Sequence, residues 1–144
     1  MLTLARANTI ADAALHEGRS RGLAPLAVAV LDAGGHLIVG KREDGAGILR
    51  FDIACGKAWG SLGMGFSSRE LASRAVAMPA FFGMLATTSG GRLVASPGGL
   101  LIFDAAGQLL GAIGVSGDLG EHDEACAAAG IVAAALHSER LAQG

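Results

Sequence analysis

The densest group of ionisable side chains follows a glycine-rich stretch, GAIGVSGDLGEHDEA, at residues 111–125. Its glycines are spaced G-x-x-G-x-x-G, whereas a dinucleotide-binding loop needs G-x-G-x-x-G and a Walker loop needs G-x-x-x-x-G-K-[ST]. No Lys or Arg occurs from 93 to 139 to meet a phosphate, and four acidic residues follow the glycines: Asp118, Glu121, Asp123 and Glu124. The sign of these charges excludes a nucleotide loop.

The acidic residues and His122 allow two interpretations. Asp and Glu in the first turn of a helix stabilise it by about 0.3–1 kcal/mol each, because they face the positive end of its dipole. This accounts for Glu121, Asp123 and Glu124 without any function. Alternatively, His122 and a neighbouring carboxylate bind a metal or transfer protons. No second metal ligand is fixed by spacing, so both interpretations stay open.

His16 is the other histidine in a chemically suggestive setting. In a helix over residues 2–21 it lies away from the apolar face, with Asp12 one turn earlier. Such a histidine could simply be solvated. Beside an oligomer interface, an exposed imidazole oriented by a carboxylate could instead be an axial haem ligand.

Lys57 is unusual because it lies on a helix of largely apolar and small residues, in CGKAWG at 55–60. A buried amine there needs either solvent or an anionic partner. Arg42 and Asp44, just after a strand end, could be its neighbours, since binding groups concentrate in loops at strand ends. The alternative is a solvated loop and a lysine that reaches water along its alkyl chain.

The elements that must position these residues alternate between helical and strand patterns. Ser67 and Glu70 have the spacing of a capping box, which predicts a helix start. The predicted order is a helix over 2–21, strands over 25–31 and 36–43, helices over 50–65 and 67–77, a short helical or irregular piece over 78–88, strands over 91–96, 98–104 and 107–117, and a helix over 121–140. Short turns between strands favour antiparallel pairing and an α+β fold.

A weak internal repeat supports this pairing. VLDAGGHLIVG at 30–40 aligns without gaps with IFDAAGQLLGA at 102–112, and both read as strand–turn–strand units. The similarity reflects either shared hairpin chemistry or a duplication.

Size and composition point to one domain over residues 1–144 that forms a homo-oligomer. The residues AVILMFWYC make up 51% of the chain and 23 residues are Gly, so many side chains are small and bury little area each. A large interface between copies would compensate for this.

Charge and targeting signals exclude several classes of protein. A net charge of −2 gives no electrostatic footprint for nucleic acid or an anionic membrane. The longest uncharged stretch, 75–91, contains Pro79 and is short for a membrane span. Cys55 and Cys126 lie far apart and signal neither a zinc site nor a disulfide framework. We expect a cytoplasmic protein.

Four stretches, in this order, resemble the GlcG/HbpS-like domain family, which also occurs at the C-terminus of PduO-type proteins and is described as haem-binding or haem-degrading. They are VAVLDAGGHLIVGKREDGA (28–46), DIACGKAWG (52–60), SPGGLLIFDAAGQLLGAIGVSGD (96–118) and HDEACAAAGI (122–131). The resemblance implies a five-stranded antiparallel sheet flanked by helices, of the profilin-like type, and assembly into dimers or larger oligomers.

The resemblance also assigns site residues. The matching positions are Arg42, Asp44 and Gly45 in an R-x-D-G element, Lys57 in a K-A helix, Gly98 and Gly99 in a G-G turn, Gly117 at the end of GVSG, and Asp123 and Glu124 in a D-E pair. A haem-ligating histidine on the first helix corresponds to His16. The chain departs from the family at Leu100 and Leu101, where the G-G turn is usually followed by a residue and a proline.

Three functional hypotheses result. In the first, haem binds with His16 or His122 as axial ligand, while Lys57 and Arg42 meet the propionates. In the second, the chain is a tautomerase, isomerase or hydratase acting on an oxo- or hydroxy-acid. Lys57 and Arg42 then hold the substrate carboxylate, and Asp44, Asp123 or Glu124 acts as general acid or base. In the third, the chain is a non-catalytic sensor or assembly subunit.

Overall fold

An antiparallel sheet is the frame of the computed structural model, which describes residues 1–141. Its strands are β1 (Ala27–Asp32), β2 (Leu37–Arg42), β3 (Gly99–Phe103) and β4 (Leu109–Ser116). Within the described residues they form one four-stranded sheet in the order β2-β1-β4-β3, with every neighbouring pair antiparallel. The α+β class and the antiparallel pairing are confirmed, and the expected fifth strand is wrong.

The missing strand is the segment 91–96, which packs on a helix instead of pairing with the sheet. The Val94 N–H donates to the Gly56 carbonyl at 3.2 Å, and the Arg92 guanidinium lies 4.0 Å from the centre of the Trp59 ring. Gly56 and Trp59 both belong to helix α2 (Arg50–Met64). A side chain at Gly56 would lie 2.4 Å from Val94, so the helix glycine makes room for this segment.

The two hairpins share their turn chemistry. The Asp32 carboxylate accepts from the N–H groups of residues 34 and 36, and the Asp104 carboxylate accepts from those of residues 106 and 108. Gly35 and Gly107 occupy matching positions with φ of 84° and 81°. These paired Asp turns account for the internal repeat in the sequence, because an Asp side chain that bonds the backbone two residues on closes this kind of turn.

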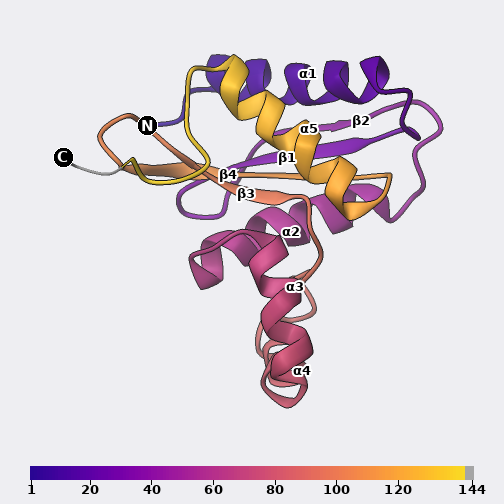
Figure 1. Cartoon of the computed structure of the whole chain (residues 1–144), viewed down its shortest axis with the longest axis vertical. Helices are drawn as coiled ribbons and strands as arrows, with labels where there is room; N and C mark the ends of the chain where they lie inside the picture. The colour runs from indigo at the N-terminus through magenta and orange to yellow at the C-terminus, as the bar shows by residue number, and fades with distance from the viewer. Residues whose placement is uncertain (142–144) are drawn as a thin grey trace.

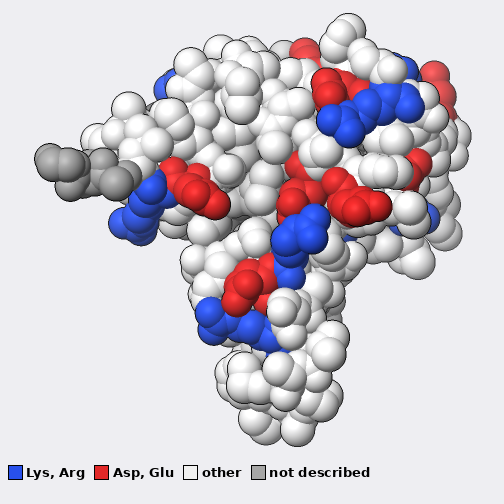
Figure 2. Space-filling model, in the orientation of Figure 1, with Lys and Arg blue, Asp and Glu red and all other residues white. Residues whose placement is uncertain are grey.

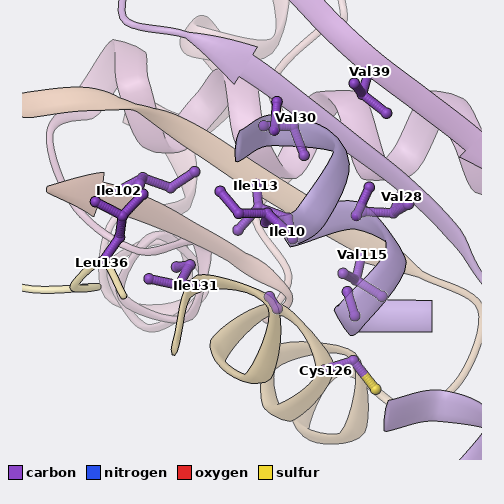
Figure 3. Close-up of a cluster of buried hydrophobic side chains, with 14 of the residues drawn as sticks. Ile10, Val28, Val30, Val39, Ile102, Ile113, Val115, Cys126, Ile131 and Leu136 are labelled. Atoms are coloured by element: carbon purple, nitrogen blue, oxygen red, sulfur yellow. The ribbon is translucent and has the colours of Figure 1, made fainter. Parts of the chain in front are cut away.

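Two helices cover one face of the sheet, α1 (Leu4–Ser20) and α5 (Gly120–Ala133), as Figure 1 shows. They approach closely because their facing residues are small, and a Cβ on Gly130 would lie 2.5 Å from the Ile10 carbonyl oxygen. Figure 3 shows the core between these helices and the strands, where Ile10, Val28 and Ile113 are fully buried.

Helix α2 covers the opposite face (Figure 1). It lies so near the sheet that a Cβ on Gly114 would sit 1.9 Å from the Ala54 carbonyl oxygen. From its end, α3 (Ser68–Ala77) and α4 (Pro79–Thr88) extend away from the sheet in Figure 1. The Ser67 hydroxyl accepts from the Glu70 N–H at 3.2 Å, so the predicted capping start of α3 is confirmed.

The last helix is shorter than the expected 121–140. It ends at Ala133, after which Ala135 adopts φ 58°. His137 then pairs with Phe103 on the outer edge of β3, through two backbone hydrogen bonds of 2.8 and 3.0 Å. His137 therefore closes part of a strand edge rather than a helix end. Among the described residues, no helix combines the length and apolar character needed to cross a membrane.

Candidate functional site

Two buried charged residues, Lys57 and Asp123, form an ion pair. Lys57 comes from α2 and Asp123 from the first turn of α5, and their side chains are 3% and 1% exposed. The Lys57 ammonium lies 3.1 Å from Asp123 Oδ2 and donates to the Val115 carbonyl at 2.9 Å. The other carboxylate oxygen accepts from the Asp118 N–H at 3.0 Å. The pair therefore ties the helices on opposite faces of the sheet to each other and to β4.

Burial and pairing act in opposite directions on these two groups. Burial lowers the pKa of Lys57 and raises the pKa of Asp123, because it disfavours the charged form of each. The opposite charge of the partner works against both shifts, and backbone N–H groups also favour the Asp123 carboxylate. With a donor on each carboxylate oxygen, the geometry is that of a satisfied internal ion pair.

Two of the glycines assigned to ligand binding, Gly98 and Gly99, make room for Lys57. A Cβ on Gly98 would lie 2.8 Å from the Lys57 Nζ, and one on Gly99 would lie 2.5 Å from the Lys57 carbonyl oxygen. At Gly117 a Cβ would lie 2.3 Å from the Pro25 carbonyl oxygen. Their lack of a side chain is explained by packing within the chain.

Arg42 ends β2, Asp44 and Gly45 lie in the loop after it, and none of the three joins the buried pair. The Arg42 guanidinium donates to the Ala46 carbonyl at 3.2 Å. Arg42 and Asp44 line a shallow hollow of about 440 Å³ that Arg19 and Pro25 also border. Gly45 has φ 83°, which closes the turn between them and α2. Of the residues that the enzyme hypothesis places around one substrate, the structure brings together only Lys57 and Asp123.

Glu124 does not join the buried pair either. It lines a cleft of about 670 Å³ along the outer edge of β3. Both of its carboxylate oxygens accept from the Arg69 Nε at 3.0 Å, and Arg69 lies at the start of α3. The Ser68 hydroxyl occupies the β3 edge at Gly99, accepting its N–H at 2.7 Å, and His137 occupies it at Phe103. Leu100 and Leu101, the departure from the family pattern, line this cleft.

The His122 side chain contacts Asp118 at the start of α5. Its Nδ1 lies 2.9 Å from Asp118 Oδ1, and the same carboxylate accepts from the Ala24 and Leu119 N–H groups at 3.0 and 2.8 Å. The Ala24 N–H, followed by His122 and the Leu119 N–H, lowers the pKa of Asp118 to about 2. Within residues 1–141, no three His, Cys, Asp or Glu side chains gather as a metal site.

His16 lies in a groove between α1 and α5 of about 630 Å³, with Ala13, Ala129 and Ala133 among its walls. The residue is exposed, and within the described part of the chain its imidazole makes no hydrogen bond or ion pair. The expected partner, Asp12, is bonded to Lys41 on β2 at 2.6 Å. The imidazole is therefore available to a ligand from outside the chain.

Sequence reasoning missed three polar side chains that matter locally. Ser68 closes the β3 edge, Lys41 neutralises Asp12 beside His16, and Asp118 organises the start of α5. Only Asp118 carried a signal, as an acidic residue just before a helix. The other two contacts join residues 31 and 29 positions apart, and no spacing rule indicates them.

Comparisons with known proteins agree with this fold. The family model described as haem-degrading protein HbpS-like matches residues 2–132, and the chain belongs to this family. A search of curated protein sequences found no significant match.

Solved structures extend the likeness over most of the chain. A PduOC–haem complex is similar with a TM-score of 0.87 and 26% identity, over 96% of this chain and 99% of that one. Protein ORFY of Klebsiella pneumoniae is similar with a TM-score of 0.83 and 28% identity, over 92% and 90%. A double mutant of HbpS from Streptomyces reticuli is similar with a TM-score of 0.78 and 32% identity, over 91% and 85%.

Proposed function

We propose that this chain binds haem in the groove between α1 and α5, with the His16 imidazole as axial ligand. The observation that carries the proposal is an exposed imidazole without a partner in the described chain, set among small side chains. Imidazole is a common axial ligand of haem iron. Membership of an HbpS-like family and similarity to a PduOC–haem complex support the same ligand.

The shape of the groove suits a flat ring. The short side chains of Ala13, Ala129 and Ala133 leave room for a macrocycle beside His16, between the polar side chains of the same groove. Val132, which directly precedes Ala133 on α5, is 73% exposed and adds apolar surface. Apolar contact with the ring compensates for the few aromatic residues available for stacking.

The acidic side chains in the groove are balanced by ion pairs and so do not repel a dianionic ligand strongly. Asp12 is paired with Lys41 at 2.6 Å and Glu17 with Arg21 at 2.9 Å. No Lys or Arg is part of the groove wall within the described residues, so the propionates of a bound haem would extend into water. Lys57 has no access to the groove surface, and Arg42 bonds Ala46, so neither enters this proposal.

When bound, haem supplies a redox-active iron whose properties depend on its axial ligand. This chain would contribute the nitrogen of His16 and a wall of alanine side chains from two helices. The buried pair contributes rigidity, because it joins α5 to α2 behind the groove.

A titration of ferric haem into purified protein, followed by its Soret absorption, tests this proposal. We expect saturable binding of one haem per chain, and loss of that saturable phase in His16→Ala. His36→Ala is the matched control, since His36 is also highly exposed but lies in the β1–β2 turn. His122→Ala should also bind normally, because the His122 imidazole bonds Asp118 at the start of α5, away from the groove. Unchanged binding by His16→Ala overturns the proposal.

The enzyme hypothesis receives less support from the geometry. Lys57 and Asp123 are almost fully buried and bonded to each other, and no cavity wall contains either residue among the described pockets. A general acid or base must come within hydrogen-bonding distance of its substrate. The pair is better placed to stabilise the fold than to meet a substrate.

A further inference from the structure

A second hollow, of about 400 Å³, lies on the α2 side of the sheet, away from the groove that contains His16 (Figure 1). The segment 91–96 packs on α2 instead of joining the sheet, and this places the Arg92 guanidinium 4.0 Å from the centre of the Trp59 ring. Leu31 near the end of β1 and Leu37 at the start of β2 also line the hollow. Three segments far apart in the sequence therefore build it.

One face of α2 forms part of the wall. The lining residues of this helix follow the spacing i, i+3, i+4, i+7, which places them on one side of it: Asp52, Cys55, Gly56 and Trp59. Together with the leucines of the hairpin they give a mainly apolar hollow that contains a few polar groups. Sites for small molecules in proteins commonly have this size and this composition.

The charged side chains of this wall, among the described residues, are Asp52 and Arg92. The Asp52 carboxylate makes no hydrogen bond or ion pair within residues 1–141. Arg92 donates from Nε to the Ser89 carbonyl at 2.9 Å, and its two terminal amino groups stay available. Burial, and then the Asp52 carboxylate, raise the pKa of the Cys55 thiol, so this group adds no charge. The hollow thus holds one available anion and one available cation.

Elsewhere on the surface, exposed arginines are paired. Arginines that each bond a carboxylate are Arg19, Arg21, Arg69 and Arg74. Figure 2 shows blue groups lying beside red ones on the visible face. The helix dipole accounts for an acidic residue in the first turn of α2, but it does not account for a cation in the same hollow. A ligand with two charges accounts for both.

The two charges belong to different ends of the hollow. Asp52 and Trp59 lie two helical turns apart on α2, which separates their backbones by about 10 Å along the helix axis. Arg92 lies over the Trp59 ring, and it forms no ion pair with Asp52. A molecule that meets both groups must carry opposite charges at its two ends.

We propose that this hollow binds an ω-amino carboxylate, a short aliphatic chain with an amine at one end and a carboxylate at the other. The planar guanidinium of Arg92 suits the ligand carboxylate, because it can donate two parallel N–H bonds. Asp52 accepts from the ligand ammonium. The aliphatic chain between them covers apolar surface of Leu31, Leu37 and Trp59. An α-amino acid carries both charges on one carbon and cannot span the two groups.

Trp59 is the only tryptophan of the chain, so its fluorescence reports on this hollow. Titrations of the haem-free protein with 4-aminobutyrate, 6-aminohexanoate and 8-aminooctanoate, followed by fluorescence and by calorimetry, test the proposal. We expect saturable binding of one ligand per chain for at least one of the two longer molecules. Their isomers norleucine and 2-aminooctanoate should bind at least about tenfold more weakly, because only one charged end can be met.

Variants of the two charged residues locate the site. Asp52→Asn and Arg92→Met should each weaken binding at least about tenfold, since each removes one charged partner. Asp12→Asn is the control for the first, because Asp12 is an exposed helix carboxylate outside the hollow. Arg74→Met is the control for the second, because the Arg74 guanidinium also lies over a ring, 4.1 Å from the centre of Phe66. Circular dichroism verifies that each variant is folded.

Three results would overturn the proposal. The first is the absence of saturable binding of every ω-amino acid, by both methods, up to about 10 mM. The second is binding of hexanoate or norleucine as tight as that of the ω-amino acids. The third is unchanged affinity in Asp52→Asn or in Arg92→Met. None of these results bears on haem binding, since His16 lies on α1, across the sheet from α2.

Discussion

Breaking the Lys57–Asp123 pair should cost a large part of the stability of this protein. Lys57→Met leaves the Asp123 carboxylate 1% exposed without its cation, and Asp123→Asn leaves the Lys57 ammonium 3% exposed without its anion. Removing one partner of a buried ion pair costs about 3–5 kcal/mol, because the remaining charge stays out of water. For a chain of this size that is a fall in melting temperature of about 6–20 °C.

The double variant Lys57→Met/Asp123→Asn should be much less damaging than the two single changes added together. The amide oxygen introduced by Asp123→Asn can still accept from the Asp118 N–H, and the Val115 carbonyl is the group that loses its donor. One unsatisfied buried carbonyl costs about 1–3 kcal/mol, against about 6–10 kcal/mol for the sum of the singles. The expected coupling energy is therefore about 3 kcal/mol or more.

Urea denaturation of the four proteins, followed by circular dichroism, measures this cycle. All four must be compared at one protomer concentration, since assembly adds to apparent stability. Single variants that each cost less than about 1 kcal/mol, or costs that simply add, would refute the structural role of the pair. Haem binding by the folded fraction should stay near the wild-type level in each variant.

Three further changes probe the frame of the site. Because the folded-state pKa of Asp118 is lowered from 3.8 to about 2, the unfolded chain binds more protons between these pH values. Stability supplied by Asp118 is therefore present above pH 3.8 and lost as the pH falls toward 2, and Asp118→Asn should flatten that part of an acid-denaturation profile. Gly98→Ala should destabilise the fold, because its Cβ would lie 2.6 Å from the Val115 carbonyl oxygen, and a rise in melting temperature would contradict the packing argument. Ile131→Ala should cost about 2–5 kcal/mol in urea denaturation, while Val132→Ala, its exposed neighbour, should stay within about 0.5 kcal/mol.

Local patterns predicted most of the elements correctly. The turn at Asp32 and its counterpart at Asp104 follow from side chains bonding nearby backbone, and the start of α3 follows from Ser67 and Glu70. Each of these signals acts over a few residues. They are therefore visible in a single sequence.

The errors came from contacts between distant segments. LVA at 93–95 has the composition of a strand, yet the Val94 N–H bonds the Gly56 carbonyl on α2. The segment can approach the helix this closely because Gly56 has no side chain. Helix α5 ends earlier than the sequence predicts, because the backbone pairing of His137 with Phe103 competes with further helix. Tertiary contacts override local propensity in both places.

In the candidate site too, local patterns were predictable and contacts between distant residues were not. The need of Lys57 for an anion was evident from its apolar surroundings, but its partner Asp123 lies 66 residues away. Asp44 was the nearer choice in sequence and remains in an exposed loop. The role of His16 stays a prediction, and its imidazole has no partner because Asp12 bonds Lys41, a contact that local sequence does not indicate.

The reduction potential of the haem-loaded protein tests the central claim most directly, because the axial ligand sets it. We expect His16→Met to raise the potential and change the Soret spectrum, or to lose haem altogether, since a thioether replaces the imidazole. His36→Met should match the wild type. A His16→Met protein that retains haem with the wild-type potential and spectrum would contradict haem ligation by His16.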